Sequence, residues 1–301
     1  MKNLSGTHRP CYKKYSMFKQ FSFLLLIFIG ISSYAQTKDS VPVKKKPVPP
    51  WWVQPFSVSA GVFVPISNTE LEVGSEDGSF GTTVDLEDDL GFKQTTTSFV
   101  GNLQWRASRR SKFDLNYFQI NRKSTHTIAK DIEFKDTTFP ANSTVNAFTN
   151  TTIVQFSYGY AFFLNPRFEA GVAIGAHIVG SQVGIGIANS GGSTGKETDY
   201  DFTAPLPDLG IWGGYAINDQ WAVNGAINYL SLTVGDVKGR ILSYNAGVTY
   251  DILKNFSASL VYAGLNFKVD VVRDHYKGYF KWGYNGPALT VNYAFGKNKW
   301  H

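Results

Sequence analysis

Cysteine is almost absent from this sequence, and apolar runs long enough to form a membrane helix are absent altogether. The 301 residues contain one cysteine, Cys11, which precedes the only sustained apolar stretch, at residues 21–31. A single cysteine excludes intrachain disulfides and thiolate metal sites. The apolar stretch is too short to cross a bilayer as a helix, which takes about 20 residues. Disulfide scaffolds and helical membrane proteins are therefore excluded.

The first 35 residues have the organisation of a secretory signal peptide. Five basic residues and no acidic ones come before the apolar stretch, and Ser33-Tyr34-Ala35 supplies the small residues of a cleavage site. We predict a signal peptide at residues 1–35, with Met17 as an alternative start because residues 17–35 form a complete signal peptide. Residues 36–50, rich in proline and lysine, are predicted to be an extended periplasmic linker.

The chain that remains after removal of the predicted signal peptide has little net charge. The chain has 29 Lys and Arg against 23 Asp and Glu, and removing the five basic residues of the leader leaves 24 against 23, or +1. A nucleic-acid-binding domain needs a basic patch or stripe. Only two short basic clusters remain, at residues 44–46 and 109–112. The composition argues against nucleic acid as a partner.

From residue 51 onward the chain has a strict alternation of apolar with small or polar residues. This period of two indicates β-strands, and it predicts ten of them, at residues 53–65, 95–107, 112–123, 149–163, 167–181, 206–217, 220–233, 239–251, 255–270 and 285–296. Short turns join the strands at residues 107–111, 164–167, 217–220 and 251–255, whereas four of the five other connections, 66–94, 124–148, 182–205, 234–238 and 271–284, are long.

Short periplasmic turns, long external loops and an even number of alternating segments are typical of transmembrane β-barrels. The sequence therefore predicts an all-β protein, a closed antiparallel transmembrane barrel of about ten strands over residues 51–301. Eight strands remain an alternative if two of the ten are hairpins at the rim. One face of each strand is continuously apolar and is expected to face lipid, while the opposite, small or polar face lines the lumen; a soluble barrel would invert this arrangement.

Aromatic residues cluster beside the short turns, as expected for the interfacial girdle of a membrane barrel. This predicted girdle includes Trp51, Trp52, Tyr215, Trp221 and Phe295. The last strand also ends in an alternating apolar set, Leu289, Val291, Tyr293 and Phe295, similar to the terminal signature of outer-membrane barrels.

Over residues 53–295 the chain resembles the small outer-membrane β-barrel proteins of Gram-negative bacteria, of the size of OmpA, OmpX or the omptins. Three stretches are similar to pieces of uncharacterised members of that class: residues 84–91, residues 235–239, and Tyr284-Asn285-Gly286-Pro287. The resemblance implies a place in the outer membrane, contact with its lipids and lipopolysaccharide, and insertion by the barrel assembly machinery. It is specific for the barrel and not for an activity.

Polar residues on the inward faces are expected to pair, because buried charges require partners. Arg106, Asp114 and Glu169 are predicted to form a cluster at the periplasmic end of the lumen. Higher in the lumen, Asp208, Asn228 and Asn245 have inward parity and form a second predicted layer. Arg240 and Lys268 have outward parity at the external strand ends, where they are expected to contact lipopolysaccharide phosphates.

Three patterns in the sequence suggest chemistry, and each also has a structural explanation. The acidic run Asp85, Glu87, Asp88 and Asp89 lacks the glycine and glutamate spacing of a calcium loop, and Ser190 and Glu197 break a phosphate-loop pattern at two positions. His177, with His126, His275, Ser181, Asp201 and Asp208 as neighbours, is a weak candidate for a catalytic base. The sequence predicts no cofactor and no metal.

The function that this pattern favours is that of an integral outer-membrane protein with a narrow or plugged lumen, in a structural or a small-solute or ligand-binding role. Two alternatives stay open, an outer-membrane enzyme acting on lipid A or peptides and a surface adhesin acting through its external loops.

Overall fold

The computed structural model describes residues 50–73, 82–134, 137–188, 194–234, 237–273 and 276–296. The predicted signal peptide and nearly all of the linker lie outside this range. The regular elements are strands: β1 (Phe56–Phe63), β2 (Ile66–Val73), β3 (Val84–Asp85), β4 (Ser98–Arg106), β5 (Ser111–Thr127), β6 (Ile132–Phe134), β7 (Thr137–Phe139), β8 (Thr144–Leu164), β9 (Phe168–Ala188), β10 (Thr194–Ala216), β11 (Trp221–Val234), β12 (Val237–Leu253), β13 (Phe256–Arg273) and β14 (Tyr276–Phe295). In the described ranges no helix is long and apolar enough to span a bilayer.

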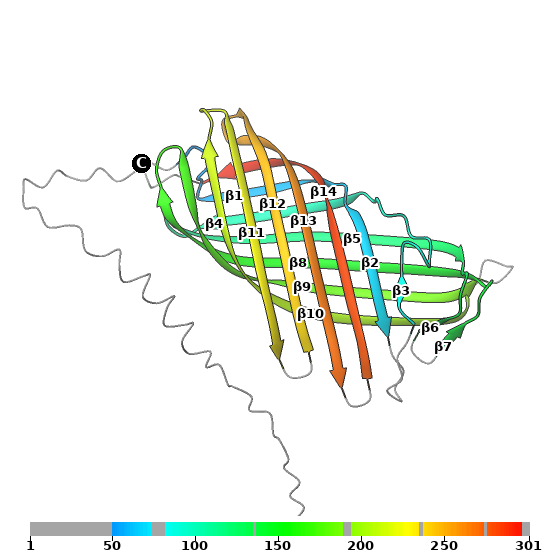
Figure 1. Cartoon of the computed structure of the whole chain (residues 1–301). Coiled ribbons are helices and arrows are strands. Elements are labelled where there is room, and N and C mark those ends of the chain that lie inside the picture. The colour runs from blue at the N-terminus through cyan, green and yellow to red at the C-terminus, as the bar shows by residue number, and fades with distance from the viewer. Residues whose placement is uncertain are drawn as a thin grey trace, which may run out of the picture. The chain divides into compact units, whose positions relative to one another are not determined.

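Ten strands form a closed antiparallel ring in this part of the chain (Figure 1). Each strand pairs with the next in the order β1, β4, β5, β8, β9, β10, β11, β12, β13 and β14, and β1 pairs with β14 to close the ring. The additional strand β2 pairs with the first half of β14, beside the half that pairs with β1. The predicted closed antiparallel barrel is confirmed, with ten strands in its ring.

One end of the barrel, which we call the turn end, has only short connections. In these turns a polar side chain satisfies the exposed backbone donors: Asn165 Oδ1 accepts from the amides of Arg167 and Phe168 at 2.9 Å. Asn218 Oδ1 accepts in the same way from Gln220 and Trp221. Asparagine and serine favour such local bonds, which explains why the predicted short turns lie where the sequence places them.

At the other end, which we call the far end, the strands are much longer than predicted. β8 and β9 have 21 residues each and β10 has 23, whereas a membrane-spanning strand needs about 9–11. The predictions of long loops at residues 182–205 and 271–284 were wrong, because most of these residues continue the strands. Of the predicted loop 124–148, residues 128–143 do connect β5 with β8 and include the short hairpin β6–β7. Figure 1 shows that β8–β10 and β11–β14 diverge toward this end.

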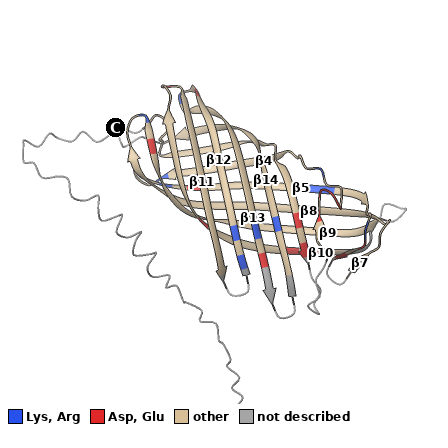
Figure 2. Cartoon of the chain, viewed as in Figure 1, with Lys and Arg blue, Asp and Glu red and all other residues tan. Residues whose placement is uncertain are grey.

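The outer wall nearer the turn end is apolar. Large apolar side chains are exposed there on every strand of the ring, for example Val58, Leu103, Leu115, Phe156, Ile174, Ile211, Val223, Val248, Leu260 and Val291. Charged residues on β12–β14 gather toward the far end (Figure 2). Exposed apolar surface of this extent marks a membrane-facing wall. We call this part of the wall the membrane band.

The lumen changes from polar to apolar along the barrel axis, a change that the alternation pattern did not predict. Near the turn end the lumen is polar, but at the far end it is filled by a large apolar cluster that includes Ile120, Val179, Val183, Phe267 and Trp282. On β9 the outward residue changes from Ile178 to Gln182 as the inward residues become apolar. A wall that leaves the lipid must face water outside, so its apolar side chains turn inward.

Candidate functional site

The base of the lumen, at the turn end, is held by a buried ion pair. Arg106 Nη2 lies 2.6 Å from Glu169 Oε1, with both side chains almost fully buried. Trp52 Nε1 donates to the same carboxylate oxygen at 3.1 Å. The predicted girdle position of Trp52 is therefore wrong, because its indole is used inside the lumen, whereas Tyr215, Trp221 and Phe295 are exposed on the outer wall. Trp51 is half-buried and bonds to the backbone of Asn218.

Asp114, the third member of the predicted basal cluster, does not join Arg106 and Glu169. Its carboxylate accepts from Gln104 Nε2 at 2.7 Å and lies 3.4 Å from Lys112 Nζ. The ammonium group of Lys112 also lies 3.9 Å from the centre of the Trp212 ring. The basal lumen thus contains two separate ion pairs, Arg106 with Glu169 and Lys112 with Asp114.

The predicted upper layer is also divided. Asp208 Oδ2 lies 2.7 Å from His177 Nδ1, and both residues are buried. Asn228 donates to Ser243 Oγ at 3.1 Å. Asn245 has the inward parity of β12, but no hydrogen bond joins it to Asp208 or Asn228 among the described residues. This level separates the polar lumen from the apolar interior of the far end.

Among the described residues, none of the candidate partners that the sequence suggested bonds to His177 except Asp208. Ser181 lies four residues further along β9, which corresponds to about 13 Å of strand, and its hydroxyl is bonded to Thr151 at 2.9 Å. Asp201 is exposed on the outward face of β10, whereas Asp208 is buried on the inward face. His275 lies outside the described residues. His177 and Asp208 are each other's hydrogen-bond partners in the barrel interior, while Asp208 Oδ1 has no partner among the described residues.

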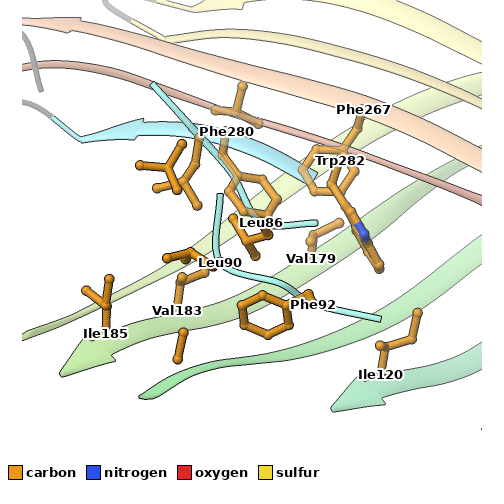
Figure 3. Packing of buried hydrophobic residues seen from close by; sticks show 14 of the residues in the cluster. Leu86, Leu90, Phe92, Ile120, Val179, Val183, Ile185, Phe267, Phe280 and Trp282 are labelled. Carbon is orange, nitrogen blue, oxygen red and sulfur yellow. The ribbon is translucent and has the colours of Figure 1, made fainter. Parts of the chain in front are cut away.

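Residues 84–92, which we call the inner segment, lie inside the barrel and not on its rim. Leu86, Leu90 and Phe92 are buried, and Figure 3 shows them surrounded by apolar side chains of the barrel wall. Gly91 has φ of 65° and lies against the ring of His126, so a larger residue would be strained there. The inner segment occupies part of the lumen at the far end.

A second buried ion pair fixes the inner segment to the wall. Glu87 forms an ion pair with Arg122 of β5, and both side chains are 3% exposed. Glu87 Oε2 also accepts from the amide of Thr69 at 2.7 Å, and Arg122 Nη2 donates to Thr69 Oγ1 at 2.6 Å. Three chain segments therefore meet at one carboxylate.

The rest of the acidic run supports its own turn. Asp85 Oδ1 accepts from the amides of Glu87 and Asp88 at 2.9 Å, and Asp89 Oδ2 accepts from the amide of Asp85 at 3.0 Å. Lys130 lies 2.9 Å from Asp89. No group of three potential metal ligands occurs in the described ranges. The acidic residues of this segment have structural roles in a tight turn and an anchor.

An apolar cavity of about 700 Å³ lies at the far end, between the two diverging groups of strands. Ligand sites in proteins have volumes of roughly 300–1,000 Å³ and few polar groups. Its wall includes Leu71, Val183, Tyr200, Phe202, Ala204, Leu206, Leu230, Leu232, Ile241, Val269 and Phe280, with Glu72, Arg240 and Tyr279 among its few polar members. This cavity is the best candidate for a functional site in the described part of the chain.

The barrel wall is interrupted beside this cavity. The pairing between β10 and β11 ends at Leu209 and Tyr229, although β10 continues to Thr194 and β11 to Val234. Leu232 has inward parity and lines the cavity, yet it is 46% exposed. We call this gap between residues 203–207 of β10 and residues 230–233 of β11 the lateral cleft. It connects the cavity with the outside of the barrel.

Basic residues lie in register on the outer wall next to the cleft. Arg240 is opposite Lys268, and Lys268 is opposite Lys281. Lys268 is paired with Asp270 at 2.7 Å and Lys281 with Glu70 at 3.1 Å, whereas Arg240 has no ion pair with a described residue. Hydrogen bonds from Tyr279 and Lys281 lower the pKa of Glu70. We call Arg240, Lys268 and Lys281 the basic row.

Sequence reasoning missed the cavity because part of its lining comes from segments in which the sequence pattern predicts loops. Ala204, Leu206 and Phe280 fall in the predicted loops 182–205 and 271–284 or at their borders. One local signal was present: Pro205 and Pro207 stand two residues apart inside a strand, and proline is found in strands at edges or bulges.

The fold is that of outer-membrane β-barrel proteins. The chain is similar to the outer membrane protease OmpT from Escherichia coli, with a TM-score of 0.52 and 12% identity over 80% of this chain and 96% of that chain. Further structural neighbours are the attachment invasion locus protein Ail of Yersinia pestis (TM-score 0.33, 10% identity, covering 81% of this chain and 100% of that chain) and the Pseudomonas putida toluene transporter TodX (TM-score 0.33, 9% identity, covering 81% and 91%). No protein-family model and no curated protein matches the sequence.

Proposed function

We propose that this protein is an integral outer-membrane β-barrel that does not conduct and that binds a small apolar molecule in the cavity at its far end. The observation that carries the proposal is the cavity of about 700 Å³ with an almost entirely apolar wall. A barrel that only stabilises a membrane needs no such space, because interiors are close-packed and cavities cost stability.

The two ends of the barrel support an orientation in the membrane. Short connections lie on the periplasmic side of membrane barrels generally, which favours the turn end in the periplasm and the far end outside the cell. The outward position of the basic row, including Arg240 and Lys268, suits contact with lipopolysaccharide phosphates. Export of the chain through its predicted signal peptide and insertion by the barrel assembly machinery belong to the same proposal.

Groups at two levels of the lumen support a protein without an open pore. Near the turn end Arg106 and Trp52 both bond to Glu169 in the lumen. At the far end the inner segment is anchored through Glu87 and Arg122. We expect the purified protein in planar bilayers to show no conductance steps of the size of a porin; regular porin-scale steps would contradict a blocked lumen.

Filling the cavity is the direct test of ligand binding. Ala204 lines the cavity, so Ala204→Phe is expected to weaken binding of the apolar fluorophore N-phenyl-1-naphthylamine about tenfold or more, because overpacking costs about 1–3 kcal/mol. Titration of the fluorophore against detergent-solubilised protein measures this effect.

Ala246→Phe is the matched control, because Ala246 is exposed on the outer wall of β12 and does not line the cavity. It should leave fluorophore binding unchanged. Equal affinities for the wild type and both variants would show that the fluorophore binds elsewhere and would refute the proposed site.

A further inference from the structure

The edge of β10 at the lateral cleft lacks two of the amide donors that would be needed to close it. The amide of Ala216 donates to Arg167 on the β9 side at 2.7 Å. Because amides alternate in direction along a strand, the odd-numbered residues of β10 direct theirs toward β11. Continuing the register of Leu209 with Tyr229 would place Pro207 opposite Ser231 and Pro205 opposite Thr233. Both positions are prolines without an amide donor, so the sequence itself keeps the cleft open.

The same prolines argue against a peptide as the occupant of the cleft. Strand addition to a sheet edge depends on main-chain hydrogen bonds, and Pro205 and Pro207 can accept such bonds but donate none. The surfaces behind the edge are also apolar, including Leu206, Leu230 and Leu232. An alkyl chain needs no hydrogen bonds and gains free energy by leaving water. The chemistry of the cleft therefore favours a lipid-like molecule.

The cleft begins where the membrane band ends. Leu209 and Tyr229, the last pair of the ladder, are both about half exposed on the outer wall. A molecule in the outer part of the bilayer can thus reach the cavity sideways. The route along the barrel axis is occupied by the inner segment and the apolar cluster around it.

One cation beside the cavity, Arg240, is placed to bind an anionic group. Arg240 lines the cavity and has no ion pair with a described residue, whereas the neighbouring Lys268 is paired with Asp270. The acidic Glu72, which also lines the cavity, accepts a hydrogen bond from Thr83 at 2.9 Å. Guanidinium groups bind carboxylates and phosphates through charge-assisted hydrogen bonds. An apolar cavity with a free arginine at its margin fits an anionic amphiphile.

We propose that the cavity takes the alkyl chain of an anionic amphiphile directly from the membrane through the lateral cleft between β10 and β11, with Arg240 holding the carboxylate or phosphate head group. This inference rests on the proposed ligand-binding function and adds the ligand class and the route. Arg240 acts in recognition, and the two prolines keep the route open.

Clamping the cleft tests the route. The double variant Pro207→Cys with Ser231→Cys places two thiols at positions that would face each other if the ladder closed. Closure would bring their Cα atoms to the separation of about 4.4–6.8 Å that a disulfide requires. The protein is placed in vesicles of phosphatidylethanolamine and phosphatidylglycerol that contain diazirine-labelled palmitate, and cross-linked cavity peptides are quantified. Oxidation is expected to reduce the cross-linking rate about tenfold, and reduction of the disulfide should restore it.

The control pair is Leu209→Cys with Tyr229→Cys, which joins residues already paired below the cleft. Its oxidation should not change the cross-linking rate. If the clamp disulfide does not form, Ser231→Cys labelled with a bulky maleimide obstructs the same cleft and should slow cross-linking equally. Undiminished cross-linking with the cleft clamped or obstructed would overturn lateral access. If N-phenyl-1-naphthylamine still bound, the proposed ligand-binding function would stand without it.

Arg240→Gln tests the head group. It is expected to reduce retention of palmitate and of lysophosphatidic acid about tenfold, the typical effect of losing a hydrogen bond to a charged group. Hexadecanol, which has the same chain without the charge, should be retained as before. Lys268→Gln is the control, because Lys268 belongs to the basic row without lining the cavity. Loss for only one of the two acids identifies carboxylate or phosphate as the head group, and equal loss for hexadecanol would overturn the role of Arg240.

Discussion

Glu87→Ala is expected to lower the free energy of unfolding by about 3–5 kcal/mol, the cost of leaving a buried charge without its partner. Arg122 would remain in the barrel interior with a side chain that is 3% exposed. The amide of Thr69 would also lose its acceptor, which lies at 2.7 Å. Urea unfolding in lipid vesicles, followed by tryptophan fluorescence and by the mobility of the unboiled protein on gels, measures the change.

Asp88→Ala is the matched control for the anchor of the inner segment. Asp88 stands next to Glu87 in the same turn but is exposed, and surface substitutions usually stay within about 0.5 kcal/mol. The double variant Glu87→Leu with Arg122→Met should recover much of the lost stability, because it removes both charges together. Similar losses for Asp88→Ala and Glu87→Ala would mean that the ion pair does not hold the inner segment.

Glu169→Ala should have a comparable effect at the other end of the barrel. The variant leaves Arg106, whose guanidinium is 2.6 Å from the carboxylate, buried and unpaired, and it removes the acceptor of the Trp52 indole. Breaking a buried pair of this kind costs about 3–5 kcal/mol. Urea unfolding of the variant in vesicles gives the magnitude, and the emission spectrum of Trp52 should shift as its surroundings become wetter.

Asp219→Ala provides the comparison, since Asp219 lies exposed in a turn at the same end of the barrel. Its unfolding midpoint should match that of the wild type. A double-mutant cycle with Arg106→Met separates the interaction energy from the effect of each side chain. A coupling energy near zero between positions 106 and 169 would contradict the structural role assigned to this pair.

The membrane-spanning half of the barrel could be predicted from the sequence because lipid imposes a simple rule on it. Every second residue must be apolar where the wall meets hydrocarbon, and Phe156, Ile174 and Leu260 follow that rule. The short turns carry equally local signals, such as the capping residues Asn165 and Asn218. These features depend on neighbours within a few positions of the chain.

The far half could not be predicted in the same way. Beyond Ile178 on β9 the inward residues become apolar and the outward residues become polar or glycine. The apolar face of the strand therefore changes from the outside to the inside of the barrel, and the difference in hydrophobicity between its two faces becomes smaller. Strands in this region were therefore assigned to loops. The inward positions of the polar residues were easier to predict than their bonding partners. Glu169 pairs with Arg106 as predicted. Asp114 was predicted to join them, but it bonds to Gln104.

The sequence alone determined the barrel and the places of its short turns and favoured ten strands over eight, since alternation and turn chemistry act locally. It also contained Pro205 and Pro207, which prevent β10 from pairing fully with β11. Only the tertiary structure decided what that interruption means, because the cavity behind it is built from residues as distant as Leu71, Leu206 and Phe280. Contacts over such separations depend on how the ring closes and where its strands diverge, which no local pattern encodes.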